Sequence, residues 1–301
     1  MTETTVVYIA GYGRSGSTLL DLMLGRLDGW FSMGEFRHFW HAVRDRYQCG
    51  CGAEVPSCPV WSEVLERAEQ GDIDAVLADR RDVLRLRRVP GLVSPRLLGR
   101  HRAASRRIAA GAARAYAATS VVTGARVLVD SSKDPLSALL LSREPGVRLH
   151  VVHLVRDSRA VAWSWKRKRR RPEIVTRDAY MPVHSALHTS IEWTLRNSLV
   201  HLARRGAAGY TRVTYESLVN DPAATLDLIT RAVVGVDATD LGSGRSDANA
   251  VNHTVGGNPM RFETTELKVR LDDEWQRSLR RRDRVLVTAL TWPLLRKYGY
   301  V

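Results

Sequence analysis

Three glycines and two polar residues near the N-terminus have the spacing of a phosphate-binding loop. Gly11, Gly13 and Gly16 follow a β-branched run, and Arg14 and Thr18 lie among and after them in "AGYGRSGSTLL". A loop between a buried strand and a helix presents unpaired backbone N–H groups at the positive end of that helix. Glycines let such a backbone approach an anion closely. The pattern therefore predicts an anion site made mostly of backbone.

This loop departs from the triphosphate-binding pattern G-x-x-x-x-G-K-[ST] at one position. Gly11, Gly16 and Thr18 match, but Ser17 stands where that pattern has lysine. The missing cation would reach the terminal phosphates of a triphosphate, so its absence disfavours a kinase or an ATPase. Arg14 is the nearest cation, and its planar guanidinium could grip one phosphate through two hydrogen bonds. A glycine-rich turn without a ligand is the alternative.

A second anion site is suggested by "RDSRAVAWS". Arg156 ends a β-branched run, and Ser164 follows eight residues later on the expected next helix. Ligands of open α/β sheets collect at the carboxyl ends of the strands, where both side chains could hold one phosphate. A surface ion pair between Arg156 and Asp157 is the alternative.

Four short runs that are rich in β-branched residues must position these groups. Each run is followed by a helix-like segment, and this alternation predicts an α/β, three-layer fold with a central, mostly parallel sheet. Asp134-Pro135 and Asp221-Pro222 each place an acceptor side chain and a fixed φ at a helix start. The four runs are "VVYIAG" (6–11), "RVLVDSS" (126–132), "RLHVVHLV" (148–155) and "TRVTYE" (211–216).

The remaining segments are interpreted as additions to one domain of residues 1–301. Residues 42–125 contain an alanine- and arginine-rich stretch without strand signals, which predicts a helical insertion or cap. Residues 166–190 begin with "KRKRRR", which predicts a mobile basic loop. No linker-like run separates either segment from the rest of the chain.

The overall charge points to an anionic partner. Lys and Arg number 46 against 32 Asp and Glu, which gives a net charge of +14. The basic run lacks interleaved aromatics for base stacking, so specific nucleic-acid binding is not expected. The N-terminal residues show no basic leader and no long apolar core, so we expect a cytoplasmic protein that does not enter a membrane.

Taken together, "GYGRSGSTLL" and "RDSRAVAWS" resemble the two nucleotide motifs of the sulfotransferases that use 3′-phosphoadenosine 5′-phosphosulfate (PAPS). In that superfamily the first motif binds the 5′-phosphosulfate and the second binds the 3′-phosphate. The resemblance implies a P-loop-like fold, PAPS as the sulfuryl donor, PAP as the product and no metal in the reaction (EC class 2.8.2). A sulfate has no need of a magnesium-bound γ-phosphate site, so the missing lysine fits this family.

Further stretches resemble the branch that contains tyrosylprotein sulfotransferases and related bacterial enzymes. "MGEFRHFW" matches at Glu35, which the resemblance implies is the catalytic base, and "DSSKDP" matches at Lys133, the implied catalytic lysine. "RVTYESLVNDP" places Tyr215 near the nucleotide. "HTVGGNPMRF" resembles a C-terminal loop that closes over the nucleotide, through Asn258 and Arg261.

The expected site therefore combines three catalytic residues with eleven donor-binding residues, and Arg14 belongs to both groups. Glu35 would accept a proton from the acceptor, and Lys133 and Arg14 would stabilise the charge that grows on the departing phosphate. His38, His41 and His253 are rival bases. The donor-binding residues are Gly13, Arg14, Ser15, Gly16, Ser17 and Thr18 for the 5′ group, and Arg156, Ser164, Tyr215, Asn258 and Arg261 for the remainder.

The acceptor is less clearly indicated. Arg37 matches an arginine that the tyrosylprotein branch uses for acidic peptides, whereas Phe36 and Phe39 suit an aromatic or apolar small molecule. We expect these residues, with Glu35, to bind the acceptor, and we favour a hydroxyl on a small molecule or sugar. Peptide tyrosine and a nucleotide-dependent phosphotransferase are the alternatives, and a homodimer is left open.

Three cysteines form one local cluster in "CGCGAEVPSCPVW". Cys49, Cys51 and Cys58 have turn-rich, metal-like spacing but supply only three ligands, so zinc would need a fourth, such as His41 or His38. Packing or a local disulfide is the favoured interpretation, and no residue of the expected site depends on the choice.

Overall fold

The computed structural model describes residues 3–69, 71–168, 170, 174, 178–242, 251–262 and 269–301. Five parallel strands form its central sheet, in the order β2-β3-β1-β4-β5. The predicted α/β fold with a parallel sheet is confirmed. The strands are β1 (Thr4–Gly11), β2 (Trp30–Gly34), β3 (Val127–Lys133), β4 (Val147–Val155) and β5 (Gly209–Thr214).

The strand β2 was not predicted from the sequence. Its five residues, "WFSMG", contain no β-branched residue and show no alternation, yet all five are buried. Trp30 pairs with Val127 of β3, so β2 forms one edge of the sheet. Its position is decided by pairing with β3, which lies far away in the sequence, rather than by local propensity.

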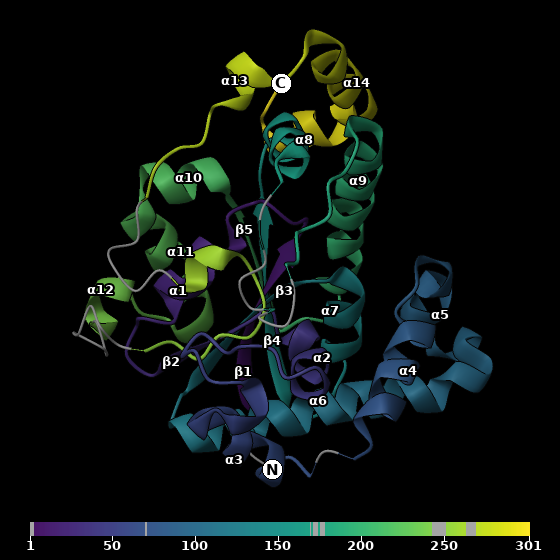
Figure 1. The fold of residues 1–301 in the computed structure, drawn as a ribbon, viewed down its shortest axis with the longest axis vertical. Coiled ribbons are helices and arrows are strands. Elements are labelled where there is room, and N and C mark those ends of the chain that lie inside the picture. Colours follow the sequence, from purple (N-terminus) through teal and green to yellow (C-terminus); the bar gives the residue numbers. More distant parts are fainter. Residues whose placement is uncertain are drawn as a thin grey trace.

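Helices cover both faces of the sheet (Figure 1). Successive residues of β1 show this directly: Val6 and Tyr8 pack in one apolar core cluster, and Val7 and Ile9 pack in another. One face carries α1 (Ser17–Leu24), α10 (Tyr215–Asn220) and α11 (Pro222–Val234), with the short α12 (Ala238–Leu241) beside them. The other carries α6 (Arg102–Thr123), α7 (Pro135–Leu141) and α9 (Ala186–Ala203).

The chain between β2 and β3 is helical. It contains α2 (Phe39–Arg44), α3 (Pro59–Arg67), α4 (Ile73–Val83) and α5 (Val89–Val93) before α6. Short 3₁₀ turns occupy Phe36–His38, Val55–Ser57, Leu86–Arg88 and Pro95–His101. In Figure 1, α4 and α5 extend away from the sheet at the lower right.

Three helices pack at the end of the sheet where the strands point. They are α8 (Ser158–Lys166), which follows β4, and the C-terminal α13 (Trp275–Ser278) and α14 (Arg281–Tyr298). A 3₁₀ turn spans Pro259–Phe262. Within the described residues, no helix is long and apolar enough to cross a membrane. The predicted basic loop is described only in part, because residues 169, 171–173 and 175–177 lie outside the described ranges.

Two predicted helix starts are confirmed, and one of them positions a site residue. The Asp134 carboxylate accepts hydrogen bonds from the backbone N–H groups of Leu136 and Ser137, and Asp221 caps α11 in the same manner. An acceptor at this position satisfies helix donors that would otherwise lack a partner. The cap on α7 follows Lys133 directly, so it holds the end of β3 in place.

Candidate active site

The glycine loop, Glu35, Lys133 and the C-terminal loop meet at the carboxyl edge of the sheet, where a cavity of about 590 Å³ opens; Arg156, Ser164 and Tyr215 are not among the residues that line it. Parallel strands all end at this edge, so the loop after β1, Glu35 after β2 and Lys133 at the end of β3 converge there. A volume of this size suits a small ligand. The convergence follows from topology, since these residues are distant in the sequence.

The first loop contains a positive φ angle and close contacts that favour glycine. Gly16 precedes α1 at φ 88°, and a Cβ there would lie 2.6 Å from the ring of Tyr215. A Cβ on Gly13 would lie 2.8 Å from the Trp165 ring. Ser17 and Thr18 line the cavity, whereas the buried Ser15 hydroxyl donates to the Tyr12 carbonyl at 2.8 Å. The loop thus exposes backbone, Ser17 and Thr18, and turns Ser15 inward.

Two predicted catalytic residues have left-handed backbones. Arg14 has φ 71° and Lys133 has φ 63°, a region that side chains other than glycine rarely adopt. Such conformations cost free energy and persist where the surrounding structure imposes them, and they concentrate at functional sites. Both residues line the cavity.

A buried ion pair joins the ends of β2 and β3. Lys133 Nζ lies 2.6 Å from Glu35 Oε1, and each side chain is 10% exposed. The other carboxylate oxygen, Oε2, accepts from Arg37 Nη2 at 3.1 Å and lies 3.6 Å from His38 Nε2. Lys133 also donates to the Ser131 carbonyl at 3.1 Å. The carboxylate therefore sits among three basic side chains inside the cavity.

Burial and charge act in opposite directions on this pair. Burial would raise the pKa of Glu35, but the cations of Lys133 and Arg37 hold that pKa well below its ordinary value. Burial lowers the pKa of Lys133, although Glu35 opposes the shift. Burial also lowers the pKa of His38, with Arg37 adding to the effect. At neutral pH Glu35 is ionised, and removal of a neighbouring cation would make it more basic.

The Arg14 side chain points toward the outer wall of the cavity. Its guanidinium lies over the Trp165 ring at 4.7 Å, and Nη2 lies 2.8 Å from Met181 Sδ. The arginine thereby links the glycine loop to α8 and to the segment after it.

In the second predicted anion site, a carboxylate from the chain is paired with the arginine. Arg156 Nη2 lies 3.4 Å from Asp272 Oδ2, and the guanidinium stacks over Tyr215 at 4.1 Å. Arg167 also binds Asp272, at 2.9 Å. Ser164 is buried on α8. The predicted phosphate-binding arginine thus already holds one anion.

The C-terminal loop lies over the glycine loop and Glu35. The Glu35 N–H donates to the Val255 carbonyl at 2.7 Å, and the Asn258 N–H donates to Thr18 Oγ1 at 3.4 Å. Arg261 is buried and donates to the carbonyls of Thr254 and Gln48. These contacts make Arg261 a support of the loop that carries Asn258 into the cavity.

The predicted acceptor residues divide into two groups. Arg37 lines the cavity beside Glu35. Phe36 and Phe39 do not: their rings stack at 4.9 Å and pack in the core, where Phe39 also contacts Trp61 at 5.1 Å. The prediction that they bind the acceptor is corrected, because the turn after β2 directs their apolar side chains inward.

A further wall of the cavity was not predicted from the sequence. It comes from α8, the segment after it and α9, and its residues are drawn from aromatic, apolar and titratable types. Along α9, residues at intervals of four face the cavity, a periodicity that the sequence does contain. The residues of this wall are Trp165, Met181, Pro182, His184, His188, Glu192 and Arg196.

The three rival histidines have different positions. His38 lines the cavity beside Glu35, whereas His41 lies near Arg44 on α2 at 3.4 Å. His253 lies among the cysteines, with Nδ1 3.2 Å from Cys58 Sγ. Only His38 of these three contacts the Glu35 carboxylate within the described structure.

A glycine loop at the carboxyl edge of a parallel sheet, with a lysine–carboxylate pair beside it, is the arrangement of a group-transfer enzyme. A family model described as "Sulfotransferase family" matches residues 7–240, more than half of the chain. The chain therefore belongs to the sulfotransferase family, as the sequence motifs predicted.

Solved structures give two similar chains. The sulfotransferase domain of the Synechococcus PCC 7002 olefin synthase is 20% identical, with a TM-score of 0.47, covering 96% of this chain and 94% of that one. A sulfotransferase domain from the curacin biosynthetic pathway is 15% identical, with a TM-score of 0.41, covering 96% and 99%. Among curated proteins no match was found.

Proposed function

We propose that this chain transfers a sulfuryl group from PAPS to a hydroxyl on a small molecule or sugar. The observation that carries the proposal is the buried Glu35–Lys133 pair, 2.6 Å apart and beside the glycine loop in one cavity. A carboxylate can take the acceptor proton, and an ammonium can stabilise charge on a departing phosphate.

The residues around the pair supply a plausible donor site. The backbone N–H groups of the glycine loop, with Ser17 and Thr18, would hold the 5′-phosphate, since they line the cavity at the start of α1. Arg156 would hold the 3′-phosphate with Ser164 and Tyr215 beside it, once Asp272 is displaced. Asn258 would close over the donor from the C-terminal loop. The donor supplies the sulfuryl group and a phosphate leaving group.

The reaction then needs one proton transfer and one displacement. Glu35 accepts the hydroxyl proton while the acceptor oxygen bonds to sulfur, and the bond from sulfur to the phosphate oxygen breaks. Lys133 and Arg14 stabilise the negative charge on that phosphate oxygen. The products are the sulfated acceptor and PAP.

Donor binding would also activate the base. Lys133 holds the Glu35 pKa low in the structure. If Lys133 turns its ammonium to the anionic donor, Glu35 keeps its burial but loses its closest cation, so its pKa rises. Proton abstraction would therefore be coupled to the presence of the donor.

The shape of the cavity favours a small acceptor. Its outer wall is made of Trp165, Met181, His184 and His188, and Arg37, the residue suggested for acidic peptides, is bound to Glu35. Peptide tyrosine is the second candidate, because Arg37 lines the cavity beside Glu35, where it could meet an acidic peptide. The single domain, the cytoplasmic location, a homodimer and a metal-free reaction stay predictions.

Ligand binding tests the donor assignment. In a thermal-shift or calorimetric comparison, PAP should stabilise the protein and Mg-ATP should not, because Ser17 replaces the lysine that a triphosphate needs. Stabilisation by Mg-ATP alone would favour the phosphotransferase alternative and contradict the proposal.

Turnover tests the transferase assignment. Incubation with PAPS and acceptor extracts, followed by mass spectrometry, should reveal a product heavier by one sulfuryl group. Lys133→Ala should still bind PAP but lose most transfer, whereas His41→Ala, which changes a residue outside the cavity lining, should retain it. Equal activity in the two variants would remove Lys133 from the mechanism.

A further inference from the structure

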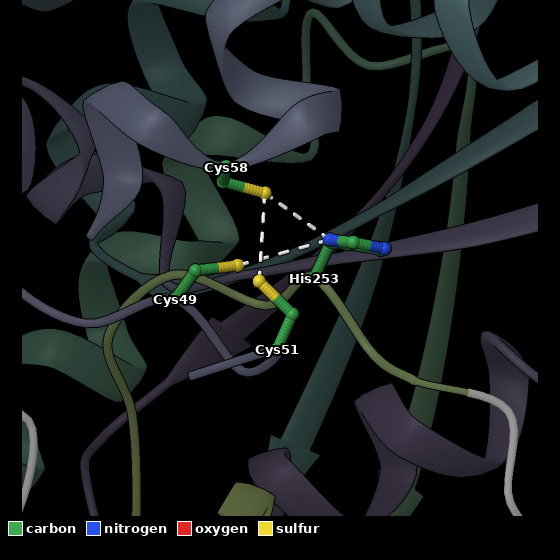
Figure 2. A group of neighbouring side chains, drawn as sticks. All are labelled: Cys49, Cys51, Cys58 and His253. Carbon is green, nitrogen blue, oxygen red and sulfur yellow. Dashed lines mark hydrogen bonds between the residues drawn. The ribbon is translucent and has the colours of Figure 1, made fainter. Parts of the chain in front are cut away.

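Four side chains that the proposed reaction does not use converge outside the active-site cavity. Their ligand atoms, one from each of Cys49, Cys51, Cys58 and His253, all lie within 4.8 Å of one another. Figure 2 shows the three sulfurs and one ring nitrogen pointing into a common space. Cys49 and Cys58 are buried, and Cys51 and His253 are half-buried.

The distances match those of a tetrahedral zinc site. Cys58 Sγ lies 3.2 Å from His253 Nδ1, Cys49 Sγ lies 4.0 Å from the same nitrogen, and Cys51 Sγ lies 3.7 Å from Cys58 Sγ. Zinc bound by sulfur at about 2.3 Å and by nitrogen at about 2.0 Å puts two sulfurs about 3.8 Å apart and a sulfur about 3.5 Å from nitrogen. The sulfur–sulfur distance of 3.7 Å is close to the first separation, and the two sulfur–nitrogen distances, 3.2 and 4.0 Å, lie on either side of the second.

The fourth ligand comes from a part of the chain that the cysteine spacing cannot indicate. His253 is about two hundred positions beyond Cys49, and neither His41 nor His38, the candidates taken from the sequence, lies in the cluster. Backbone contacts hold His253 in place. Its carbonyl accepts from Trp61 Nε1 at 2.7 Å, and the next residue's carbonyl accepts from the Gly50 N–H at 3.0 Å.

We propose that Cys49, Cys51, Cys58 and His253 bind one zinc ion as a structural Cys₃His site. Three thiolates and one imidazole complete a tetrahedron, so the ion keeps no position for a substrate and takes no part in sulfuryl transfer. A disulfide between Cys51 and Cys58, whose sulfurs lie 3.7 Å apart, would use only two of the four groups and would not explain why Cys49 and His253 converge with them.

The site joins two segments that shape the cavity. The cysteines follow α2 and precede α3, while His253 begins the C-terminal loop that includes Val255, Gly257 and Asn258. Val255 accepts from the Glu35 N–H, and a Cβ on Gly257 would lie 3.7 Å from Glu35 Oε1. A zinc ion would therefore fix the loop that covers Glu35 and Thr18.

Metal content of the intact wild-type protein is the first test. Protein purified under reducing conditions without chelator should contain about one zinc per chain by mass-spectrometric elemental analysis. A strong chelator should lower Tm by on the order of 5–10 °C, and zinc should restore it. Cobalt in place of zinc should give the visible bands of a tetrahedral ion and a thiolate charge-transfer band.

Matched variants assign the ligands. Cys51→Ser, which changes the half-buried cysteine, and His253→Ala should lose most of the zinc, whereas His41→Ala should keep it. Hydrogen exchange should show that chelation exposes the amide of Gly50, which joins the two segments, and that of Val255, which joins the C-terminal loop to Met33 of β2.

Two results would overturn the proposal. One is wild-type protein that has no zinc, takes up none on titration and shows an unchanged Tm with chelator. The other is an intact mass that reveals a Cys51–Cys58 disulfide in protein purified without reductant. Because both are measured on the wild-type chain, a variant that fails to fold does not affect the decision.

Discussion

The cavity has two walls of different construction. We call the glycine loop 11–18, Glu35 and Lys133 the donor wall. The acceptor wall consists of Trp165, Met181, Pro182, His184, His188, Glu192 and Arg196. Strand ends, left-handed backbones and buried ion pairs hold the donor wall rigid. The acceptor wall consists of side chains on a helix face and a connecting segment. Under the proposed function, the donor wall would perform the chemistry and the acceptor wall would select the substrate.

The largest expected effect is a loss of kcat when the donor wall is changed. Glu35→Gln should lower kcat by about 10²–10⁴-fold for every acceptor, because a general base is lost from the donor wall. Steady-state rates with PAPS should show little change in the KM of the acceptor. His38→Ala is the control, and a kcat loss confined to that variant would make His38 the base.

A second prediction concerns the buried carboxyl group of Asp21 and its effect on the pH dependence of stability. Burial raises the pKa of Asp21 on α1 to about 8, although the Ser32 hydroxyl opposes the shift at 2.6 Å. The folded pKa exceeds the unfolded one, near 4, so this residue's contribution to stability is greatest at low pH and is lost as pH rises toward 8. The loss amounts to roughly 1.4 kcal/mol per pH unit in that window.

Asp21→Asn should remove this part of the pH dependence. Between pH 6 and pH 8, the variant should gain about 2–3 kcal/mol relative to the wild type in its free energy of unfolding, measured by urea denaturation. Parallel stability curves for the two proteins would show that Asp21 ionises normally in the fold.

A third, smaller effect would test whether Asp272 competes with the donor. Asp272→Asn should tighten PAP binding by about three- to tenfold, since a partly exposed ion pair on Arg156 contributes on the order of 1 kcal/mol. Calorimetry with PAP measures the change, and Glu274→Gln, a change at an exposed carboxylate that pairs with Arg167, is the control. Weaker binding in Asp272→Asn would instead make Asp272 a support for Arg156.

The smallest effect should appear on the acceptor wall. His184 and His188 lie with ring centroids 4.5 Å apart, and His184 also contacts Trp165 at 4.5 Å. His188→Ala should raise the acceptor KM by about three- to tenfold, as expected for loss of one substrate contact. PAP affinity should stay unchanged. A matching loss of PAP affinity would abolish the distinction between the walls.

Local patterns in the sequence predicted the glycine loop and most of its scaffold, whereas Glu35 and Lys133 were predicted only through the family resemblance. Glycine spacing indicated the loop at Gly11 to Gly16, the alternation of runs indicated the parallel sheet, and Asp134 and Asp221 indicated two helix starts. These predictions succeed because each depends on residues within a few positions, whose backbone preferences are largely intrinsic. Parallel topology then brings the strand ends together.

Contacts between distant segments decided the rest. Only the folded chain directs Phe36 and Phe39 into the core, pairs "WFSMG" with β3, places His188 in the same cavity as Arg14 and brings His253 to the cysteines. Each of these outcomes depends on which apolar surface is buried against which neighbour. The packing that results has the lowest free energy for the whole chain, and a short segment of the sequence does not determine it. The sequence by itself determined what the site is made of locally, and tertiary packing decided which distant side chains complete it.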